Sequence, residues 1–324
     1  MTRPLLELTD LKVVFDTDEG VLAAVDGVGF SIQRNEVLGL VGESGCGKSV
    51  TAMSMLSLIP SPPGRIVSGR ALFDGRDLIS LSHQELRQIR GRRISMIFQD
   101  PMTALSPLHR IGNQLAEVWA IHSSMKNREA LERAREWLGK MGIPDPGDAI
   151  SAYPHELSGG MQQRVMIAMA LMLDPELVIA DEPTTALDVT TSAQIFELLH
   201  EMRRDRTSIL LITHDLGVVW ETCDRVLVMY AGKLVEEAPV RELFRQPAHP
   251  YTRELLRSIP GFDPDRELYA IKGQVPSALN YPAGCRFHDR CPDAFGRCEQ
   301  EEPPLYVLSG GRRSACFLAE KWVS

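Results

Sequence analysis

The sequence lacks any long hydrophobic run, and its longest, residues 165–173, has only nine residues. A helix needs about 20 apolar residues to cross a bilayer, so we expect no transmembrane segment. No charged-then-apolar leader opens the chain either, because Arg3, Glu7 and Asp10 lie within its first ten residues. We therefore expect the chain to be made and kept in the cytosol.

The sequence also has no excess of basic residues, with 35 lysines and arginines against 43 acids and a net charge of −8. A protein that tracks the phosphates of a nucleic acid needs a broad basic surface, so this charge argues against a nucleic-acid partner. The composition, 44% hydrophobic and 24% charged, is ordinary for a soluble α/β protein. Internal repeats and low-complexity tracts are absent.

Residues 42–49 read Gly-Glu-Ser-Gly-Cys-Gly-Lys-Ser and fit the pattern G-x-x-x-x-G-K-[ST]. In such a loop the backbone N–H groups turn inward around phosphate oxygens, and the lysine reaches the terminal phosphates of a nucleotide. We assign Lys48 to the β- and γ-phosphates and the Ser49 hydroxyl to Mg²⁺. The remaining loop residues that we expect to contact the nucleotide are Gly42, Ser44, Gly45, Cys46 and Gly47.

The pattern needs a strand before it and a helix after it. Residues 37–41 are apolar and predict a short buried strand, and residues 49–58 predict a helix whose N-terminus faces the anion. A chance glycine-rich turn followed by Lys-Ser is the alternative, and the flanking elements argue against it.

A second apolar run, residues 177–182, predicts a strand that ends in two adjacent acids, Asp181 and Glu182. Successive side chains of a strand point to opposite sides, so the two carboxylates need different partners. Asp181 suits the magnesium shell, and Glu182 can act as the general base for the attacking water. Solvated acids at a strand end are the alternative interpretation.

The phosphate loop and the five motifs that follow it, taken in order, resemble the ATPase subunits of ATP-binding cassette (ABC) transporters over roughly residues 5 to 245. After the phosphate loop, Phe98-Gln99-Asp100-Pro101 resembles the glutamine loop, and residues 157–163, Leu-Ser-Gly-Gly-Met-Gln-Gln, resemble the family signature. The sequence then continues with the acidic strand end, with Ala186-Leu187-Asp188 at the position of the D-loop, and with Thr213-His214 at that of the switch histidine.

The resemblance implies that two cassettes pair head to tail and that each chain supplies half of each ATP site. Ser158, Gly159 and Gly160 precede the helix that we expect over residues 161–173, and they would hold the γ-phosphate bound to the partner's loop. Asp188 would contribute as the D-loop acid. Gln99 would contact magnesium and the attacking water and link to the membrane subunits, while His214 would position that water.

Two further residues are candidates for nucleotide binding. Phe15, near the end of the first expected strand, is a candidate for stacking on adenine, and a core phenylalanine is the alternative. Val50 stands where many relatives carry a hydroxyl that touches the α-phosphate, and it offers only its backbone N–H. We therefore expect somewhat weaker nucleotide binding and intact chemistry.

The predicted fold is the α/β P-loop NTPase fold of ABC ATPases, with an antiparallel β subdomain, a helical subdomain and a small cysteine-rich C-terminal extension. Residues 5–32 and 67–73 predict the antiparallel strands, and residues 100–165 the helical subdomain, with residues 127–141 a good amphipathic helix. Strands and helices then alternate over residues 177–235. We place the nucleotide-binding domain at residues 1–245 and the extension at residues 246–324.

The extension is rich in proline and contains four of the six cysteines, spaced C-x5-C-x6-C-x17-C. Cytosolic thiols are kept reduced, so metal binding is favoured over disulfides, and a segment with little core gains stability from a metal. The pattern lacks the C-x2-C pairs usual in zinc ribbons, which argues against zinc. Free thiols are the third alternative. The four residues are Cys285, Cys291, Cys298 and Cys316.

Residues 249–256 and 284–292 resemble the C-terminal region of oligopeptide and dipeptide importer ATPases, and nickel importers share parts of it. In several such proteins four cysteines at this kind of spacing hold a 4Fe-4S cluster, so the resemblance implies one here. We expect His288, inside the cysteine run, to be a surface histidine, Cys223 to be a buried helix residue, and Cys46 to take the place of a usually small side chain.

These features together predict an ATP-hydrolysing subunit of a di- or oligopeptide ABC importer that uses ATP and Mg²⁺. It would lie at the cytoplasmic side of the inner membrane, peripheral to two permease subunits, and pair with an identical or homologous ATPase. An extracytoplasmic substrate-binding protein would deliver the cargo. Three alternatives are an importer of nickel or another small solute, a soluble ABC ATPase of DNA repair or translation, and an extension that senses redox state or iron.

Overall fold

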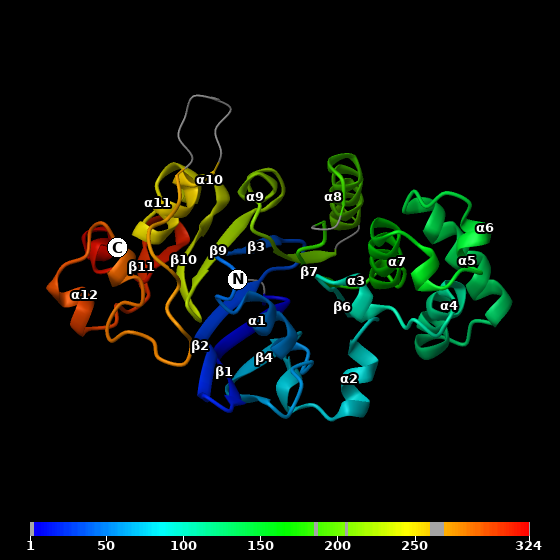
Figure 1. Cartoon of the computed structure of the whole chain (residues 1–324), viewed down its shortest axis with the longest axis horizontal. Helices are drawn as coiled ribbons and strands as arrows, with labels where there is room; N and C mark the ends of the chain where they lie inside the picture. The colour runs from blue at the N-terminus through cyan, green and yellow to red at the C-terminus, as the bar shows by residue number, and fades with distance from the viewer. Residues whose placement is uncertain (1–2, 185–186, 205–206, 260–268, 324) are drawn as a thin grey trace. The chain divides into compact units, whose positions relative to one another are not determined.

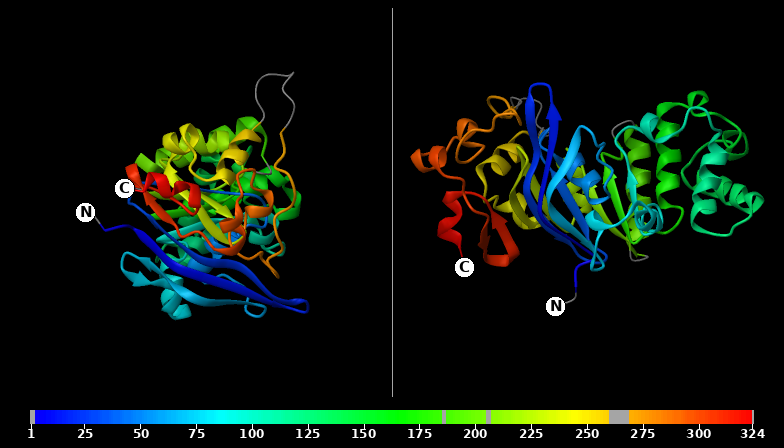
Figure 2. Two further views of the ribbon diagram at one scale, coloured as in Figure 1. Left: turned by 90° about the vertical axis from the view of Figure 1, so that its left-hand side faces the viewer. Right: turned by 90° about the horizontal axis from the view of Figure 1, so that it is seen from below.

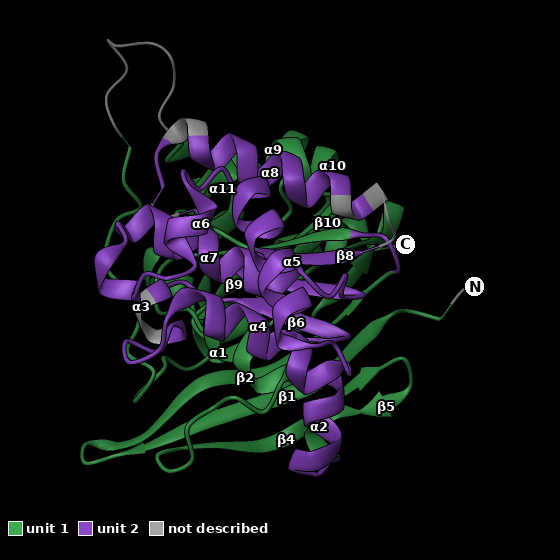
Figure 3. Cartoon of the chain, turned by 90° about the vertical axis from the view of Figure 1, so that its right-hand side faces the viewer, with its two compact units in different colours: residues 1–33, 37–80, 212–324 green, residues 34–36, 81–211 purple. Residues whose placement is uncertain are grey.

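The computed structural model describes residues 3–184, 187–204, 207–259 and 269–323. The chain divides into two compact units, each described by itself below (Figure 3). Unit 1 comprises residues 1–33, 37–80 and 212–324, and unit 2 comprises residues 34–36 and 81–211. The C-terminal residues therefore belong to the same compact unit as the phosphate loop.

Unit 1 contains an antiparallel sheet with the strand order β2-β1-β4-β5 (Figure 1). Its long strands are the ones expected from the N-terminal part of the sequence, and register shifts interrupt the pairing of β1 with both neighbours. The antiparallel prediction is confirmed, although the strand expected over residues 67–73 begins earlier. The strands are β1 (Leu6–Thr17), β2 (Gly20–Ile32), β4 (Gly64–Phe73) and β5 (Arg76–Asp77).

A second set of strands in unit 1 has the order β11-β12-β10-β9-β3. Strand β3 is parallel to β9, whereas β9-β10, β10-β12 and β12-β11 are antiparallel pairs. The C-terminal strands thus extend the sheet beyond β10, as the red ribbons beside it show (Figure 2). The strands are β3 (Val37–Val41), β9 (Arg225–Tyr230), β10 (Lys233–Pro239), β11 (Tyr306–Leu308) and β12 (Arg312–Ser314).

The helices of unit 1 are short. Helix α1 follows β3 through the phosphate loop, α9 and α10 flank the β9-β10 hairpin in sequence, and α11 and α12 belong to the C-terminal segment. They span α1 (Lys48–Met55), α9 (Leu216–Thr222), α10 (Val240–Arg245), α11 (Pro250–Arg257) and α12 (Gly296–Gln300). Single 3-10 turns are η1 (Leu78–Ser80), η3 (His288–Arg290), η4 (Ser309–Gly311) and η5 (Phe317–Trp322).

Unit 2 has three strands in the order β8-β7-β6, and β6 and β7 are parallel. All residues of these strands are buried, which explains why they appear in the sequence as continuous apolar runs. The strands are β6 (Ile94–Ile97), β7 (Leu177–Asp181) and β8 (Ser208–Ile212).

Helices are the other main elements in the described part of unit 2, and several of them lie within residues 100–165, where a helical region was expected. Ala130, Ala134 and Leu138 form the buried stripe of α5, as the amphipathic pattern predicted. The helices are α2 (His83–Ile89), α3 (Pro101–Ala104), α4 (Ile111–His122), α5 (Asn127–Lys140), α6 (Pro146–Ala149), α7 (Gly159–Leu171) and α8 (Val189–Arg204), with a 3-10 turn η2 (Pro154–Glu156).

Several predicted boundaries were wrong by a few residues, each for a local reason. Helix α1 begins one residue early and stops at Met55, and Ser57 then has a left-handed φ of 50°. Helix α7 begins two residues early because Ser158 caps it, and it ends at Leu171, three residues before Asp174, which has a φ of 49°. Strand β7 stops at Asp181 because the following Glu182 has a φ of 48°, which no strand residue adopts.

Within the described residues, no helix is both long enough and apolar enough to span a membrane.

Candidate active site

The phosphate loop of unit 1 joins β3 to α1, as the pattern predicted. Gly42 has a φ of 151° and Gly47 a φ of 103°, values that side-chain-bearing residues rarely adopt. A Cβ atom at Gly42 would lie 2.1 Å from the Met229 carbonyl oxygen, and one at Gly47 would lie 2.4 Å from that of Ala24. Both glycines are therefore required by close backbone approaches as well as by conformation.

Lys48 lies at the start of α1 with its ammonium group turned back over the loop. Its Nζ donates hydrogen bonds to the carbonyl oxygens of Gly42 (2.8 Å) and Glu43 (3.0 Å). The first intrahelical bond of α1 runs from Thr51 N to Gly47 O, so the N–H groups of Lys48, Ser49 and Val50 precede the helical ladder. These N–H groups, the cation and the helix N-terminus suit a bound phosphate.

The other loop residues differ in exposure. Ser44 and Gly45 are exposed, and a Cβ at Gly45 would meet no atom within 4 Å. Cys46, by contrast, is fully buried, and this burial raises the pKa of its thiol. Cys46 can therefore contribute only its backbone to a bound nucleotide.

In unit 2, the acidic strand end forms a contact with the glutamine loop. Asp181 is the buried last residue of β7, and Glu182 follows it half-buried in a left-handed conformation. Gln99, two residues after β6, donates a hydrogen bond from Nε2 to Glu182 Oε2 at 3.1 Å. The two parallel strands end at the same edge, which brings these polar residues together.

The signature residues lie at the N-terminus of α7 in unit 2. Ser158 caps the helix by accepting a hydrogen bond from Met161 N, and both Ser158 and Gly159 are exposed. A Cβ at Gly159 would meet no atom within 4 Å, so the surface above it is open. The buried Gln163 donates from Nε2 to the Pro183 carbonyl oxygen at 2.8 Å, which ties α7 to the turn after the acidic strand.

The expected D-loop lies partly outside the described residues, because Ala186 is not among them. Asp188 is exposed and accepts hydrogen bonds from the backbone N (2.9 Å) and the hydroxyl (2.8 Å) of Thr191. It therefore caps the start of α8. This capping bond is a structural role that the sequence analysis did not assign to it.

His214, in unit 1, is exposed and follows the last residue of β8 by two positions. The next residue, Asp215, caps α9 by accepting hydrogen bonds from Gly217 N (2.8 Å) and Val218 N (3.2 Å). Phe15 is half-buried on β1, paired with Leu22 on β2, which leaves adenine stacking as a prediction.

The four C-terminal cysteines line one small cavity in unit 1, together with Phe287, Phe317 and Leu318. All are free thiols, and burial raises the pKa of Cys291 to about 11 and that of Cys316 to about 12. Backbone N–H groups point to three of the four sulfur atoms, those of Cys285, Cys291 and Cys316. Within the described residues, however, no group of three or more His, Cys, Asp or Glu is arranged to hold a metal ion.

Two smaller expectations about this region were wrong. His288 is not a surface histidine, because its side chain is only 15% exposed and lines the same cavity. Cys223 is buried as expected but is the C-cap residue after α9 rather than part of a helix. The sequence analysis also missed Tyr251 and Arg290, which both contact the phosphate loop at Glu43 and show no pattern that would have indicated it.

Known proteins resemble this chain over almost its whole length. Residues 25–185 match the ABC transporter family, and residues 235–298 match the C-terminal region of oligopeptide/dipeptide transporters. The chain is 50% identical to a probable peptide ABC transporter ATP-binding protein, y4tR, of Sinorhizobium fredii, over 99% of this chain and 96% of that one. It is also 50% identical to the oligopeptide transport ATP-binding protein AppD of Bacillus subtilis, over 98% and 97% of the two chains.

Solved structures show the same fold. A dimeric ATP-binding cassette, MJ0796, solved in a post-hydrolysis state with ADP and phosphate, superposes with a TM-score of 0.66 at 28% identity, over 73% of this chain and 99% of that one. The ABC transporter protein cbiO1 of Clostridium perfringens gives a TM-score of 0.60 at 28% identity, over 76% and 92% of the two chains. The chain therefore belongs to the ABC transporter family, as an ATP-binding subunit of its oligopeptide/dipeptide branch.

Proposed function

We propose that this chain hydrolyses ATP with Glu182 as general base and thereby drives the import of di- and oligopeptides. ATP hydrolysis coupled to peptide transport is the activity of this family branch. The observation that supports the catalytic assignment best is the Glu182 carboxylate, held by Gln99 at 3.1 Å directly after the buried strand β7.

In the proposed reaction a water oxygen attacks the γ-phosphorus while the bond from that phosphorus to the β–γ bridging oxygen breaks. Glu182 takes the proton of the attacking water, and ADP and phosphate leave. Lys48 and the N–H groups of the loop stabilise the charge on the phosphate oxygens, and His214 orients the water. Gln99 positions Glu182 and the water.

Ser49, Asp181 and Gln99 would hold Mg²⁺, since a hydroxyl, a carboxylate and an amide oxygen are the hard donors that this ion prefers. When bound, the ion neutralises charge on the β- and γ-phosphate oxygens. The family fold implies both ATP and Mg²⁺.

The chain acts in a head-to-tail pair with a second ATPase, identical or homologous. Ser158, Gly159 and Gly160 are exposed or partly exposed at the start of a 13-residue helix, and a Cβ at Gly159 would meet no atom within 4 Å, so they can meet a γ-phosphate held by the other chain. Asp188, and Ala186 outside the described residues, complete the D-loop of that interface.

The pair binds two permease subunits at the cytoplasmic face of the inner membrane, and an extracytoplasmic binding protein delivers the peptide. The supporting observation is that the match to peptide transport ATPases covers nearly the whole chain, C-terminal region included. We place the nucleotide-binding domain at residues 1–245 and the extension, rich in cysteine, at residues 246–324.

The extension holds a 4Fe-4S cluster through Cys285, Cys291, Cys298 and Cys316. Four thiols around one cavity, three of them facing backbone N–H donors, are the donor set that such a cluster uses. Iron, acid-labile sulfide and zinc, measured on chain purified without oxygen, decide between the cluster, zinc and free thiols.

Reconstitution tests the transport function. The chain, its partner ATPase, the permeases and the binding protein in liposomes should take up a labelled di- or oligopeptide when ATP is supplied on the cassette side. Uptake of Ni²⁺ without peptide uptake would favour the nickel alternative. Failure of the chain to associate with any permease would favour a cassette ATPase outside transport.

A further inference from the structure

Arg290, in the C-terminal segment, forms a paired contact with the phosphate loop. Its two terminal nitrogens lie 2.7 and 2.9 Å from the two carboxylate oxygens of Glu43. The arginine side chain is only 5% exposed and also donates to the Tyr230 hydroxyl at 3.2 Å. A largely buried pair of this kind is costly to break on one side, because the remaining charge loses its partner.

A second contact holds the same loop residue. The backbone N of Glu43 donates to the Tyr251 hydroxyl at 2.9 Å, so helix α11 reaches the loop as well. The rings of Tyr251, Tyr230 and Phe287 pack on one another with centroids 4.6 to 5.3 Å apart. Phe287 is 1% exposed and lies three residues before Arg290. The buried ring therefore anchors the segment that bears the arginine.

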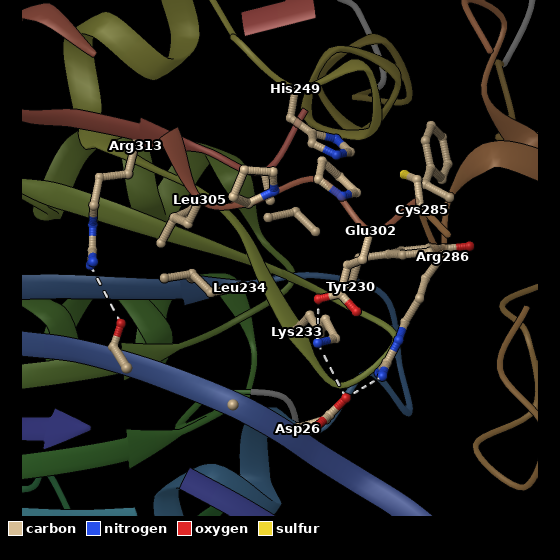
Figure 4. Close-up of a pocket in the computed structure, with 17 residues that line it drawn as sticks. Asp26, Tyr230, Lys233, Leu234, His249, Cys285, Arg286, Glu302, Leu305 and Arg313 are labelled. Atoms are coloured by element: carbon tan, nitrogen blue, oxygen red, sulfur yellow. Dashed lines mark hydrogen bonds and ion pairs between the residues drawn. The ribbon is translucent and has the colours of Figure 1, made fainter. Parts of the chain in front are cut away.

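Arg286, four residues before Arg290, makes an indirect connection to the phosphate loop. It donates to the Ala231 carbonyl oxygen at 2.5 Å and forms an ion pair with Asp26 on β2, as the close-up shows (Figure 4). The next residue after Ala231, Gly232, donates from its backbone N to the carbonyl oxygen of Cys46 at 3.0 Å, inside the phosphate loop.

Residues 285–291, which we call the linking segment, therefore have two kinds of contact. The cysteines at the two ends, Cys285 and Cys291, line the four-cysteine cavity. Of the arginines between them, Arg290 contacts Glu43 in the phosphate loop. Arg286 contacts Ala231, the residue before the Gly232 that is hydrogen-bonded to the loop. All of these residues belong to unit 1.

We propose that Arg290 is a positioning residue for the phosphate loop and that the linking segment couples the four-cysteine cavity to nucleotide binding. This inference rests on the proposed function, since it requires ATP to bind at residues 42–49. A group that binds in the cavity, or a reagent that modifies its thiols, moves Cys285 and Cys291 and so changes the position of Glu43. Coupling between two sites is reciprocal, so a nucleotide in the loop also changes the state of the cysteines.

A double-mutant cycle tests whether Arg290 positions the phosphate loop. A fluorescent ATP analogue is titrated against the full chain. Arg290→Gln and Glu43→Gln should each weaken binding by roughly five- to twentyfold, a common size for coupling between sites. The double variant should be no weaker than either single one, because residues in direct contact are not additive. Arg290→Lys, which keeps the charge but not the paired geometry, should lie between.

The matched control is Arg297→Gln. Arg297 belongs to the same C-terminal segment and also pairs with two acids, Glu301 and Glu320, but neither lies in the phosphate loop. Its loss should leave nucleotide affinity within twofold. Equal weakening by Arg290→Gln and Arg297→Gln would mean a general effect on the segment and would overturn the inference.

The coupling between the four-cysteine cavity and nucleotide binding is tested by thiol alkylation of the unchanged chain, followed residue by residue with mass spectrometry. A non-hydrolysable ATP analogue should change the alkylation rates of Cys285 and Cys291 at least threefold, and Arg290→Lys should reduce that change. Alkylation rates that are the same with and without the ATP analogue would overturn the coupling, even if Arg290→Gln fails to fold. If the unchanged chain binds no nucleotide at all, it is the proposed function that fails.

Discussion

Gln99 and Glu182 lie 83 residues apart in the sequence, yet the Gln99 amide donates to the Glu182 carboxylate at 3.1 Å. Each residue follows the end of one of two parallel strands, β6 and β7, which are paired from Ile94 with Leu177 onward. The candidate general base is therefore held by a residue to which the family resemblance gives a role at magnesium and the attacking water. This arrangement leads to the first prediction.

Glu182→Gln should lower ATP turnover by about 10² to 10⁴-fold, because the amide cannot take the proton of the attacking water. Nucleotide affinity should be unchanged, since the glutamine carbonyl can still accept the hydrogen bond from Gln99. Phosphate release and analogue binding measure the two effects. Glu176→Gln is the control, because Glu176 is an acid of the same unit that pairs with Arg34 and Arg93. Turnover within threefold of the unchanged chain would remove Glu182 from its role.

Gly159→Asp should abolish ATPase activity while leaving the chain folded and able to bind ATP. The added side chain has open space around it, but its charge would repel a γ-phosphate presented by the second ATPase. ATP-dependent dimers, measured by sedimentation in a Glu182→Gln background, should be lost too. Gly147→Asp is the matched control, because a Cβ at Gly147 would also meet no atom within 4 Å and the residue belongs to another helix, α6. Loss of activity in both variants would contradict the assignment.

Val50→Thr should bind ATP and ADP about three- to tenfold more tightly, as expected for one additional hydrogen bond. Threonine has the shape of valine, and its hydroxyl would supply the α-phosphate contact that a valine side chain cannot make. Because the α-phosphate does not react, turnover at saturating ATP should stay the same. Val21→Thr, at an exposed position of β2, is the control. Tighter binding of ATP alone would point to a contact with the γ-phosphate instead.

His249 makes the stability of the chain sensitive to mild acid. The residue is buried, which lowers its pKa to about 3, and its Nδ1 accepts a hydrogen bond from Tyr251 N at 3.0 Å. The unfolded chain takes up a proton near pH 6.5 and the folded chain does not, so stability is present above pH 6.5 and is lost as the pH falls toward 3. The loss between pH 7 and pH 5 should be about 2 kcal/mol.

His249→Asn separates this effect from other titrations. The asparagine Oδ1 can accept the same hydrogen bond from Tyr251, and the variant has no group at this position that titrates near pH 6. Burial raises the pKa of the neighbouring Glu236, but Glu236 is common to both chains and cancels in the difference. Chemical denaturation at pH 7 and pH 5 measures both free energies of unfolding. Parallel pH dependence in the two chains would mean that His249 is protonated in the folded state.

The sequence was sufficient to predict an element or a site residue where one local pattern specifies both the backbone conformation and the chemistry. The run of residues 42–49 requires glycines at Gly42 and Gly47 for backbone reasons, and strand β3 came from a continuous apolar stretch. The boundaries were less well predicted, since they depend on single residues such as the Ser158 cap or the left-handed Glu182.

The sequence by itself determined the family, the ATP-binding motifs and the adjacent acids Asp181 and Glu182. Each of these is recognised from residues that lie close together in the sequence. Only the tertiary structure decided that the C-terminal residues join the unit of the phosphate loop, that four cysteines surround one cavity, and that Arg290 pairs with Glu43. That pair joins residues 247 positions apart. No local pattern encodes such a contact, because it depends on how β10, α11 and the linking segment pack against the loop.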